Sequence, residues 1–310
     1  MTALISIVTP CYNEEENVKT LIEKIASVMA TLPYEYEHIL IDNASTDGTV
    51  HIVKAIAATN KRVKLIVNAR NFGHIRSPYH ALLQAKGDAC ICMASDLQDP
   101  PENIPLFIKK WEEGFKVVLA VKKSADENFI MNRIRRGFYR LINSISEVKL
   151  TDNTTGAGMF DRKVIEILKE LRDPYPYFRG LLSEIGLPIA TVEFRQPARA
   201  RGITKNNFFT LYDIAMLGIT NHSKIPLRLV AIAGFILSLI SFMLGFAFLV
   251  AKLLFWNSFS LGIAPSLIGI FFLGSAQMLF LGVIGEYIGF MHTKMRNFPL
   301  VVELERVNFE

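Results

Sequence analysis

Cysteine is scarce in this chain of 310 residues, which contains only Cys11, Cys90 and Cys92. So small a number argues against a disulfide scaffold and fits a protein of a reducing compartment. Cys90 and Cys92 alternate within the apolar run 89–93. We therefore expect them to be small buried side chains of a strand rather than metal or redox groups.

Two familiar N-terminal signals are also missing. No G-x-G-x-x-G motif follows the first apolar run, which argues against a dinucleotide site. The first residues carry no basic cluster and their apolar run ends at Pro10, so we expect no signal peptide. The net charge of +5 is concentrated in the strips 131–150 and 195–228, which argues against a general nucleic-acid binder.

Long uncharged stretches are present, by contrast, near the C-terminus. Residues 229–250 and 253–285 contain no charged side chain. Because a bilayer core of about 30 Å needs about 20 helical residues, we predict two transmembrane helices, at about 229–251 and 264–288.

Basic residues flank these predicted spans unequally. Lys224 and Arg228 precede the first span, Lys294 and Arg296 follow the second, and only Lys252 lies between them. Positive residues favour the cytoplasmic side, so we expect a multi-pass protein of the plasma (inner) membrane with both termini cytoplasmic.

The first 120 residues alternate between short β-rich runs and amphipathic stretches. The expected strands are 4–9, 38–42, 63–67, 89–93 and 117–121. This alternation predicts an α/β fold with a mainly parallel, Rossmann-like sheet. We expect a catalytic domain at 1–200, a juxtamembrane amphipathic segment at 201–226, a membrane anchor at 227–290 and a cytoplasmic tail at 291–310.

Polar residues follow four of these runs, in the sequences CYNEEEN, DNASTDGT, NARNFGH and ASDLQDPP. Ligands of open α/β sheets bind at the carboxyl ends of strands, so we expect these sequences to meet there. Asp42 can accept a hydrogen bond from a nucleobase. Ser45 to Gly48 suit a turn, with Ser45 or Thr46 as the N-cap of the next helix.

The sequence ASDLQDPP has two interpretations. Asp96 and Gln98 offer the oxygen ligands that Mg²⁺ or Mn²⁺ prefers, beside a substrate diphosphate. Alternatively the two aspartates cap a helix that starts at Pro100 and Pro101. We expect Asp96 to serve the metal and Asp99 to serve the cap.

The two basic strips are also open to two interpretations. Arg133 and Arg136 flank an amphipathic stretch that suits either a membrane-surface helix or an ordinary core-facing helix. Arg199, Arg201 and Lys205 suit either specific phosphate recognition or general anchoring to lipid headgroups.

The chain resembles the family 2 GT-A glycosyltransferases that act on polyisoprenyl phosphates, such as bactoprenol glucosyltransferases and, more distantly, dolichyl-phosphate mannose synthases. The resemblance covers essentially the whole chain. It rests on the ordered motifs SIVTPCYNEEENV, DNASTDGT, NFGH, SDLQDPP, DRKV, YFRGL and RARGITK, followed by the two spans.

The resemblance implies inverting transfer of a sugar, by expectation glucose from UDP-glucose, to undecaprenyl phosphate on the cytoplasmic face. It implies a nucleotide pocket, metal ligands beside the diphosphate, and basic contacts to phosphate and lipid. By that resemblance the pocket comprises Pro10, Tyr12, Glu14, Asp42, Ser95 and Asp96, the metal ligands are Asp96 and Gln98, and the basic contacts are Arg133, Arg136, Arg199, Arg201 and Lys205. Asp96 and Asp99 are the candidate catalytic residues.

Departures from the family pattern leave alternatives. Many relatives have an aspartate where this chain has Ala94, and Gly where it has Ala44. Other donors (UDP-GlcNAc, a UDP-4-amino-arabinose type or GDP-mannose) therefore remain open, as does a non-catalytic nucleotide-binding scaffold. A processive synthase is less favoured because no Q-x-x-R-W motif is present. Glycines such as Gly234 and Gly274 in the spans would permit a homo-oligomer.

Overall fold

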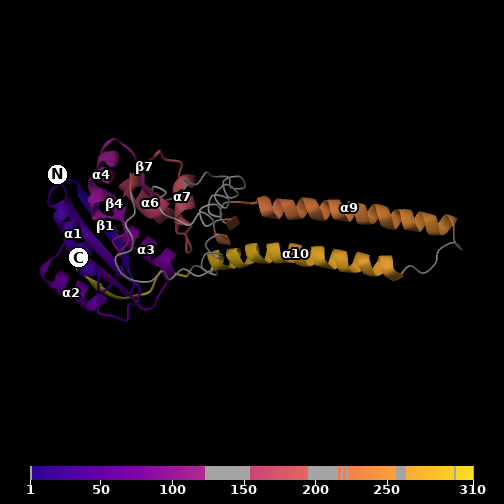
Figure 1. Cartoon of the computed structure of the whole chain (residues 1–310), viewed down its shortest axis with the longest axis horizontal. Coiled ribbons are helices and arrows are strands. Elements are labelled where there is room, and N and C mark those ends of the chain that lie inside the picture. The colour runs from indigo at the N-terminus through magenta and orange to yellow at the C-terminus, as the bar shows by residue number, and fades with distance from the viewer. Residues whose placement is uncertain are drawn as a thin grey trace.

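The computed structural model describes most of the chain as one sheet domain followed by two long helices (Figure 1). The described residues are 2–122, 154–194, 216–217, 219–220, 223–255, 263–296 and 298–309. The statements below concern these residues.

The domain is built on a sheet of eight strands. The strands are β1 (Leu4–Cys11), β2 (Glu35–Asp42), β3 (Val63–Asn68), β4 (Ala89–Cys92), β5 (Val117–Lys122), β6 (Thr154–Asp161), β7 (Ile189–Phe194) and β8 (Glu303–Val307). The five strands expected from the sequence are all present, with Met93 falling just beyond the end of β4.

The spatial order of the strands is β7-β5-β6-β4-β1-β2-β3-β8. Neighbours within β4-β1-β2-β3 are parallel, as the sequence predicts. β6 inserts between β4 and β5 and is antiparallel to both, while β8 is antiparallel to β3. The mainly parallel α/β prediction is therefore confirmed, with two antiparallel additions that local patterning does not reveal.

Helices cover both faces of the sheet. α1 (Val18–Met29), α2 (Thr49–Thr59) and α4 (Ile104–Glu112) pack on one face, and α4 is preceded by a 3₁₀ turn, η1 (Pro101–Asn103). α3 (Gly73–Gln84), α6 (Arg162–Leu171) and α7 (Phe178–Glu184) pack on the other. Burial on both faces explains why the central strands are continuously apolar.

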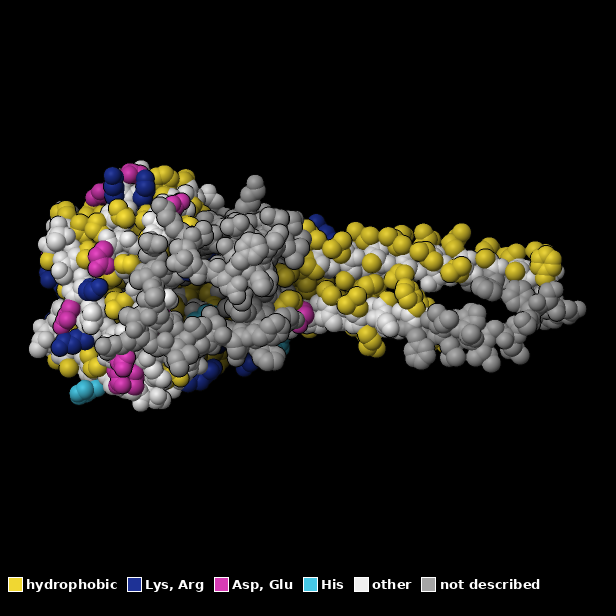
Figure 2. Space-filling view, viewed as in Figure 1, with side chains coloured by type: hydrophobic (Ala, Val, Ile, Leu, Met, Phe, Trp, Pro, Cys, Tyr) yellow, Lys and Arg dark blue, Asp and Glu magenta, His cyan; other side chains and the backbone are white. Residues whose placement is uncertain are grey.

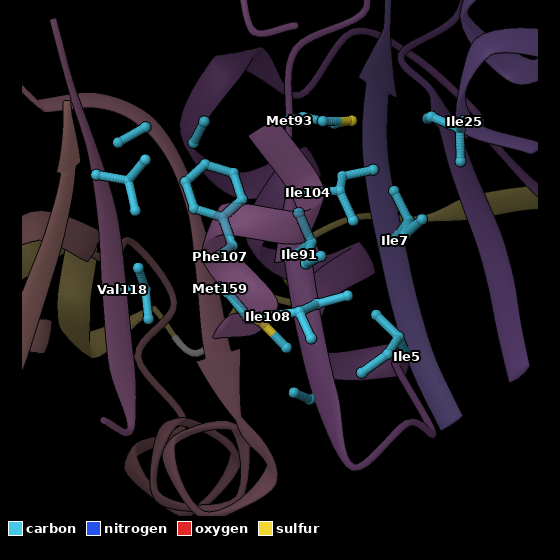
Figure 3. Packing of buried hydrophobic residues seen from close by; sticks show 14 of the residues in the cluster. Ile5, Ile7, Ile25, Ile91, Met93, Ile104, Phe107, Ile108, Val118 and Met159 are labelled. Carbon is cyan, nitrogen blue, oxygen red and sulfur yellow. The ribbon is translucent and has the colours of Figure 1, made fainter. Parts of the chain in front are cut away.

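The core beneath α1 and α4 is buried. Figure 3 shows Phe107 of α4 among aliphatic side chains from the strands, including Ile91 and Val118. Ile7 and Ile91 are 0% exposed and Phe107 is 1% exposed. Cys90, also 0% exposed, packs on the opposite face, as expected for a small buried side chain, whereas Cys92 is half-buried. Neither forms a disulfide.

α9 (Ile225–Leu254) and α10 (Ile263–Met295) project from the domain as a pair (Figure 1). At 1.5 Å per residue each is longer than the roughly 30 Å core of a bilayer. The stretches Ile225–Leu244 and Phe272–Met295 are long and apolar enough to span it, and neither is buried by the rest of the described chain. Figure 2 shows apolar side chains along their visible surface.

The chain after α10 returns to the sheet. Ala69 N donates to Val302 O (2.9 Å), and Asn68 at the end of β3 pairs with Glu303 at the start of β8. The predicted C-terminal tail therefore contributes an edge strand. The same pairing places the carboxyl end of β3 next to the segment that leaves α10.

Candidate active site

The carboxyl ends of β1, β2 and β4 lie together, as the sequence predicts. Cys11 at the end of β1 pairs with Asp42 at the end of β2, and Val8 pairs with Cys92 at the end of β4. Met93 N then donates to Val8 O (3.1 Å). The loops that carry Tyr12 and Asp96 therefore leave neighbouring strands at one edge of the sheet.

The loop after β1 is fastened to the loop after β2 by reciprocal hydrogen bonds. Asn13 N donates to Ser45 Oγ (2.8 Å), and Asn13 Oδ1 accepts from Thr46 N (2.8 Å). Glu14 N donates to Thr49 Oγ1 (2.8 Å), and Glu15 Oε2 accepts from Gly48 N (2.7 Å). We call this set of contacts the loop clasp.

The loop clasp gives the polar residues of DNASTDGT structural roles. α2 begins at Thr49 with Gly48 at the N-cap, so the expectation that Ser45 or Thr46 would be the N-cap is wrong. Asp47 Oδ1 instead accepts from Thr49 N (3.0 Å). The signal for the loop clasp was present in the sequence as two polar runs after adjacent strands, but which residues pair depended on register.

Asp42 lies at the base of this edge and is 0% exposed. Its Oδ2 accepts from Ser45 N (2.8 Å) and its Oδ1 accepts from Ser45 Oγ (2.5 Å). Burial raises the pKa of Asp42, and the Ser45 hydrogen bonds oppose that rise. Ser45 and the backbone of Ala44 therefore hold this carboxylate within its own loop.

Pro10, Tyr12 and Glu14, the other predicted nucleoside contacts, lie at or just beyond the end of β1 and are half-buried. Glu14 Oε2 accepts from Asn17 Nδ2 (2.7 Å) at the start of α1. The fold thus brings these three residues to the same edge as Asp42.

Asn43 holds the loop that follows β3. Its Oδ1 accepts from Phe72 N (2.8 Å) and its Nδ2 donates to Asn71 Oδ1 (2.8 Å) and to Gly73 O (3.2 Å). These contacts explain why an amide serves at this position, since a carboxylate has no donor for the last two.

Ala44, between Asp42 and Ser45, has a left-handed backbone with φ +63°. Glycine adopts this conformation without a steric penalty, whereas an L-residue is disfavoured there. Ala44, where many relatives have Gly, is therefore a site of local backbone strain.

The loop after β4 holds Ser95, Asp96 and Asp99, which are 6%, 8% and 6% exposed, and Gln98, which is half-buried. Asp96 Oδ1 accepts from Gln98 N (3.2 Å), which brings the two predicted metal ligands to one turn. Leu97 between them has φ +59°.

Asp99 does not cap the following helix. Asp99 Oδ2 accepts from Ala94 N (3.3 Å), while η1 has Pro100 at its N-cap and no side-chain cap. The capping prediction is therefore wrong, because the carboxylate turns back to close its own loop. The predicted start of a helix after Pro100 is correct.

The ligand chemistry of this loop fits a hard divalent cation. Asp96 and Gln98 supply carboxylate and amide oxygens, and no group of three or more His, Cys, Asp or Glu able to hold a metal is found in the described part of the chain. Such a sparse set suits a cation that retains waters and substrate phosphate oxygens, as Mg²⁺ does, rather than a closed zinc site.

The predicted basic contacts cannot be placed relative to this edge. Arg133, Arg136, Arg199, Arg201 and Lys205 all lie outside the described residues.

Comparisons with known proteins agree along almost the whole chain. Residues 6–168 match the model of the family described as Glycosyl transferase family 2. A bactoprenol glucosyl transferase of Shigella phage SfII is 34% identical over 296 residues, which are 95% of this chain and 96% of that protein. An uncharacterized glycosyltransferase of Synechocystis is 34% identical over 302 residues, covering 97% and 94% of the two chains.

Among solved structures, glucosyl-3-phosphoglycerate synthase from Mycobacterium tuberculosis, in complex with Mn²⁺, UDP and phosphoglyceric acid, has a TM-score of 0.49. It is 20% identical, and the match covers 70% of this chain and 76% of that one.

Proposed function

This chain belongs to glycosyl transferase family 2 and is a glycosyltransferase of the GT-A fold, and on that premise we propose that it transfers glucose from UDP-glucose to undecaprenyl phosphate. The observation that carries the proposal is the 34% identity to a bactoprenol glucosyl transferase over 95% of this chain. A match of that extent includes the apolar helices as well as the sheet domain. The two proteins therefore share both the sheet domain and the segment of apolar helices.

The position of the helices supports a lipid acceptor. β8 enters the sheet beside the carboxyl end of β3, directly after the segment that leaves α10. The edge that holds Asp42 and Asp96 is thus the edge nearest the apolar helices. A nucleotide sugar bound there from water would meet an acceptor whose phosphate lies at the membrane surface.

We assign the nucleoside to Pro10, Tyr12, Glu14 and Asp42 and the diphosphate to the Ser95–Asp96 turn. Asp42 would accept from an N–H of the nucleobase. The loop clasp would hold the β1 and β2 loops at a fixed separation before the nucleotide arrives, which reduces the entropic cost of binding.

Asp96 and Gln98 would hold Mg²⁺ or Mn²⁺ beside the diphosphate. When bound, such a cation offsets the negative charge of a leaving diphosphate. Asp99 would act as a positioning residue, since its bond to Ala94 N closes the loop that presents Asp96.

The transfer breaks the bond between the anomeric carbon and the UDP oxygen and forms one to an acceptor phosphate oxygen, with inversion. UDP leaves with the electron pair of the broken bond. A phosphate monoester, with a second pKa of about 6, is already ionised near neutral pH. The protein must therefore position and screen the reactants more than remove a proton, and we assign no general base.

We further propose that the catalytic domain and both termini are cytoplasmic. Lys224 and Arg228 at the start of α9 and Lys294 and Arg296 at the end of α10 all lie at the domain end of the helix pair. Arg133, Arg136, Arg199, Arg201 and Lys205 remain proposed contacts to phosphate and lipid. A homo-oligomer through the glycine-containing helix faces also remains a proposal.

The test uses the purified full-length protein with UDP-glucose, undecaprenyl phosphate and Mg²⁺, and measures the glucolipid. Asp96→Asn should lower kcat/KM by about a hundredfold or more, because it removes a charge that acts on the leaving group. Asp88→Asn is the matched control. Asp88 lies just before the opposite end of β4, where its Oδ2 accepts from Leu4 N (2.8 Å).

Three outcomes would contradict parts of this proposal. Full activity and unchanged metal dependence in Asp96→Asn would remove the metal assignment. Product from a different UDP- or GDP-sugar, but none from UDP-glucose, would change the donor. No glycolipid with any sugar or metal, while UDP still binds, would indicate a non-catalytic scaffold.

A further inference from the structure

A cavity of about 120 Å³ lies where the sheet domain meets the end of α10. Its walls include Arg70 and Arg76 around the start of α3, Tyr175 from the segment before α7, and Thr293 and Arg296 from the end of α10. Two segments that are remote in sequence therefore bring three guanidinium groups to one cavity, and a third segment adds Tyr175.

The positive charge of this cavity is not neutralised within the described part of the chain. None of the ion pairs there involves Arg70, Arg76 or Arg296. Burial lowers the pKa of Arg76, and repulsion from Arg70 and Arg296 lowers it further. Three guanidinium groups that lack a counter-charge among the described residues suit an anion.

The acid next to the lining residue Pro174 is already engaged. Asp173 pairs with Lys294 of α10. This pair joins the helix to the domain without supplying a carboxylate to the three arginines.

Arg76 retains an unused donor in a fixed position. Its Nη2 donates to Pro299 O (2.6 Å), and its guanidinium lies 5.1 Å from the centre of the Phe298 ring. Its Nε is buried and has no acceptor among the described residues. Arg70 lies over the Phe72 ring at 4.2 Å. Aromatic packing thus holds two guanidiniums in place in advance of a ligand.

In a bilayer spanned by α10, the cavity would lie at the level of the lipid headgroups. Arg296 directly follows Met295, the last residue of the candidate membrane stretch, and Thr293 lies in its last turn. Basic pockets at the end of a transmembrane helix suit phosphate headgroups, which arginine binds bidentately.

The same cavity is tied to the candidate active site. Asn43, which follows Asp42, accepts from Phe72 N (2.8 Å), and Phe72 carries Arg70 on its ring. An anion in the cavity would therefore lie next to the loop after β3, which Asn43 at the end of β2 holds in place.

From these observations we propose that Arg70, Arg76 and Arg296 form a binding site for the phosphate group of a membrane lipid. The site is distinct from the basic residues expected from the sequence, and it rests on the proposed function only for its placement at a membrane surface. Its lipid is either the polyprenyl phosphate acceptor or an anionic phospholipid of the surrounding bilayer.

The test measures lipid retained by the full-length protein in neutral detergent, by native mass spectrometry. Polyprenyl phosphate, phosphatidylglycerol and phosphatidylcholine are added separately, and inorganic phosphate serves as a water-soluble competitor. Arg70→Gln combined with Arg296→Gln should weaken retention of the preferred lipid by about tenfold or more. Arg76 is left intact because its bond to Pro299 also holds the C-terminal segment.

Arg228→Gln is the matched control, since Arg228 lies near the start of α9 at the same end of the helix pair but does not line the cavity. It should retain lipid as the unmodified protein does. A melting temperature for each variant verifies that the fold is intact.

The outcomes separate the sources. Preferential loss of polyprenyl phosphate with a raised KM for that acceptor would assign the cavity to the acceptor. If the double variant lost phosphatidylglycerol as much as polyprenyl phosphate, with an unchanged KM for the acceptor, the cavity would be assigned to a structural lipid. Displacement by inorganic phosphate alone, with no lipid retained, would overturn the lipid assignment.

Equal losses in the double variant and in Arg228→Gln would also overturn the proposal, because only general charge attraction would then be acting. The same holds if neither variant loses lipid. Retention is read without turnover, so a protein that binds lipid in the cavity yet makes no glycolipid would overturn the proposed function and leave this site standing.

Discussion

The sheet domain and the helix pair treat apolar side chains in opposite ways. Ile7 and Ile91 in the sheet are 0% exposed, whereas Phe235 on α9 and Met278 on α10 are 72% and 69% exposed to the surroundings. Apolar side chains are thus buried away from water in the sheet domain and exposed on the surface of the helices. The domain hides its apolar surface from water within itself, and the helices present theirs for a bilayer to cover.

The largest expected effect comes from placing one charge in each region. Phe235→Lys should disfavour membrane insertion by about 2.5–3.5 kcal/mol, the cost of a lysine near the centre of a span. Leu106→Lys is the matched change, since Leu106 is 47% exposed on α4 of the sheet domain. It should cost little because water solvates the new charge.

Membrane fractionation and the melting temperature of each variant measure this difference. Equal recovery of both variants in the membrane fraction would contradict the assignment of α9 to the bilayer. Equal loss of stability would contradict the contrast between the two surfaces.

A second prediction asks whether the domain interior excludes charge as a bilayer does. His38 on β2 is 1% exposed, its Nε2 lies 3.0 Å from Thr9 Oγ1, and burial lowers its pKa to about 3. An unfolded histidine titrates near 6.5, so between pH 6.5 and 3 the unfolded chain binds a proton that the native one excludes.

The free energy of unfolding should therefore decrease as the pH is lowered through that window, by about 1.4 kcal/mol per pH unit from this group. His38→Gln removes the titration, so its melting temperature should decline less steeply than that of the unmodified protein between pH 6.5 and 5. Parallel declines would show that His38 is accessible to protons in the native state.

The smallest expected effect lies at the edge of the sheet, where neither burial nor lipid decides stability. Ala44→Gly should raise the free energy of unfolding by about 0.5–1 kcal/mol, because relief of the left-handed strain exceeds the added freedom of the unfolded chain. Ala55→Gly in the exposed middle of α2 should lower it by about as much.

Denaturant unfolding of the two variants under identical conditions checks the opposite signs. Destabilisation by both substitutions would show that the backbone at Ala44 is not strained in solution.

Much of the architecture follows from local pattern. Val18, Leu21 and Ile25 predict the buried face of α1, and all three are 0% exposed. The polar runs at Cys11–Asn17 and Asp42–Thr49 meet because the carboxyl ends of adjacent parallel strands must lie at one edge. Local pattern was insufficient for Asp99, whose choice between capping a helix and closing its loop depended on the path of the loop backbone.

By itself the sequence determined the periodic elements, the two lipid-length helices and the gathering of Asp42 and Asp96, because each depends on side-chain spacing or on the direction of neighbouring strands. Only the tertiary structure decided that β6 would insert antiparallel beside β4 and that β8 would return to β3. It alone brought Arg296 to Arg70 and Arg76 across more than two hundred residues of chain. Such contacts arise from the packing of distant segments, and no local periodicity encodes them.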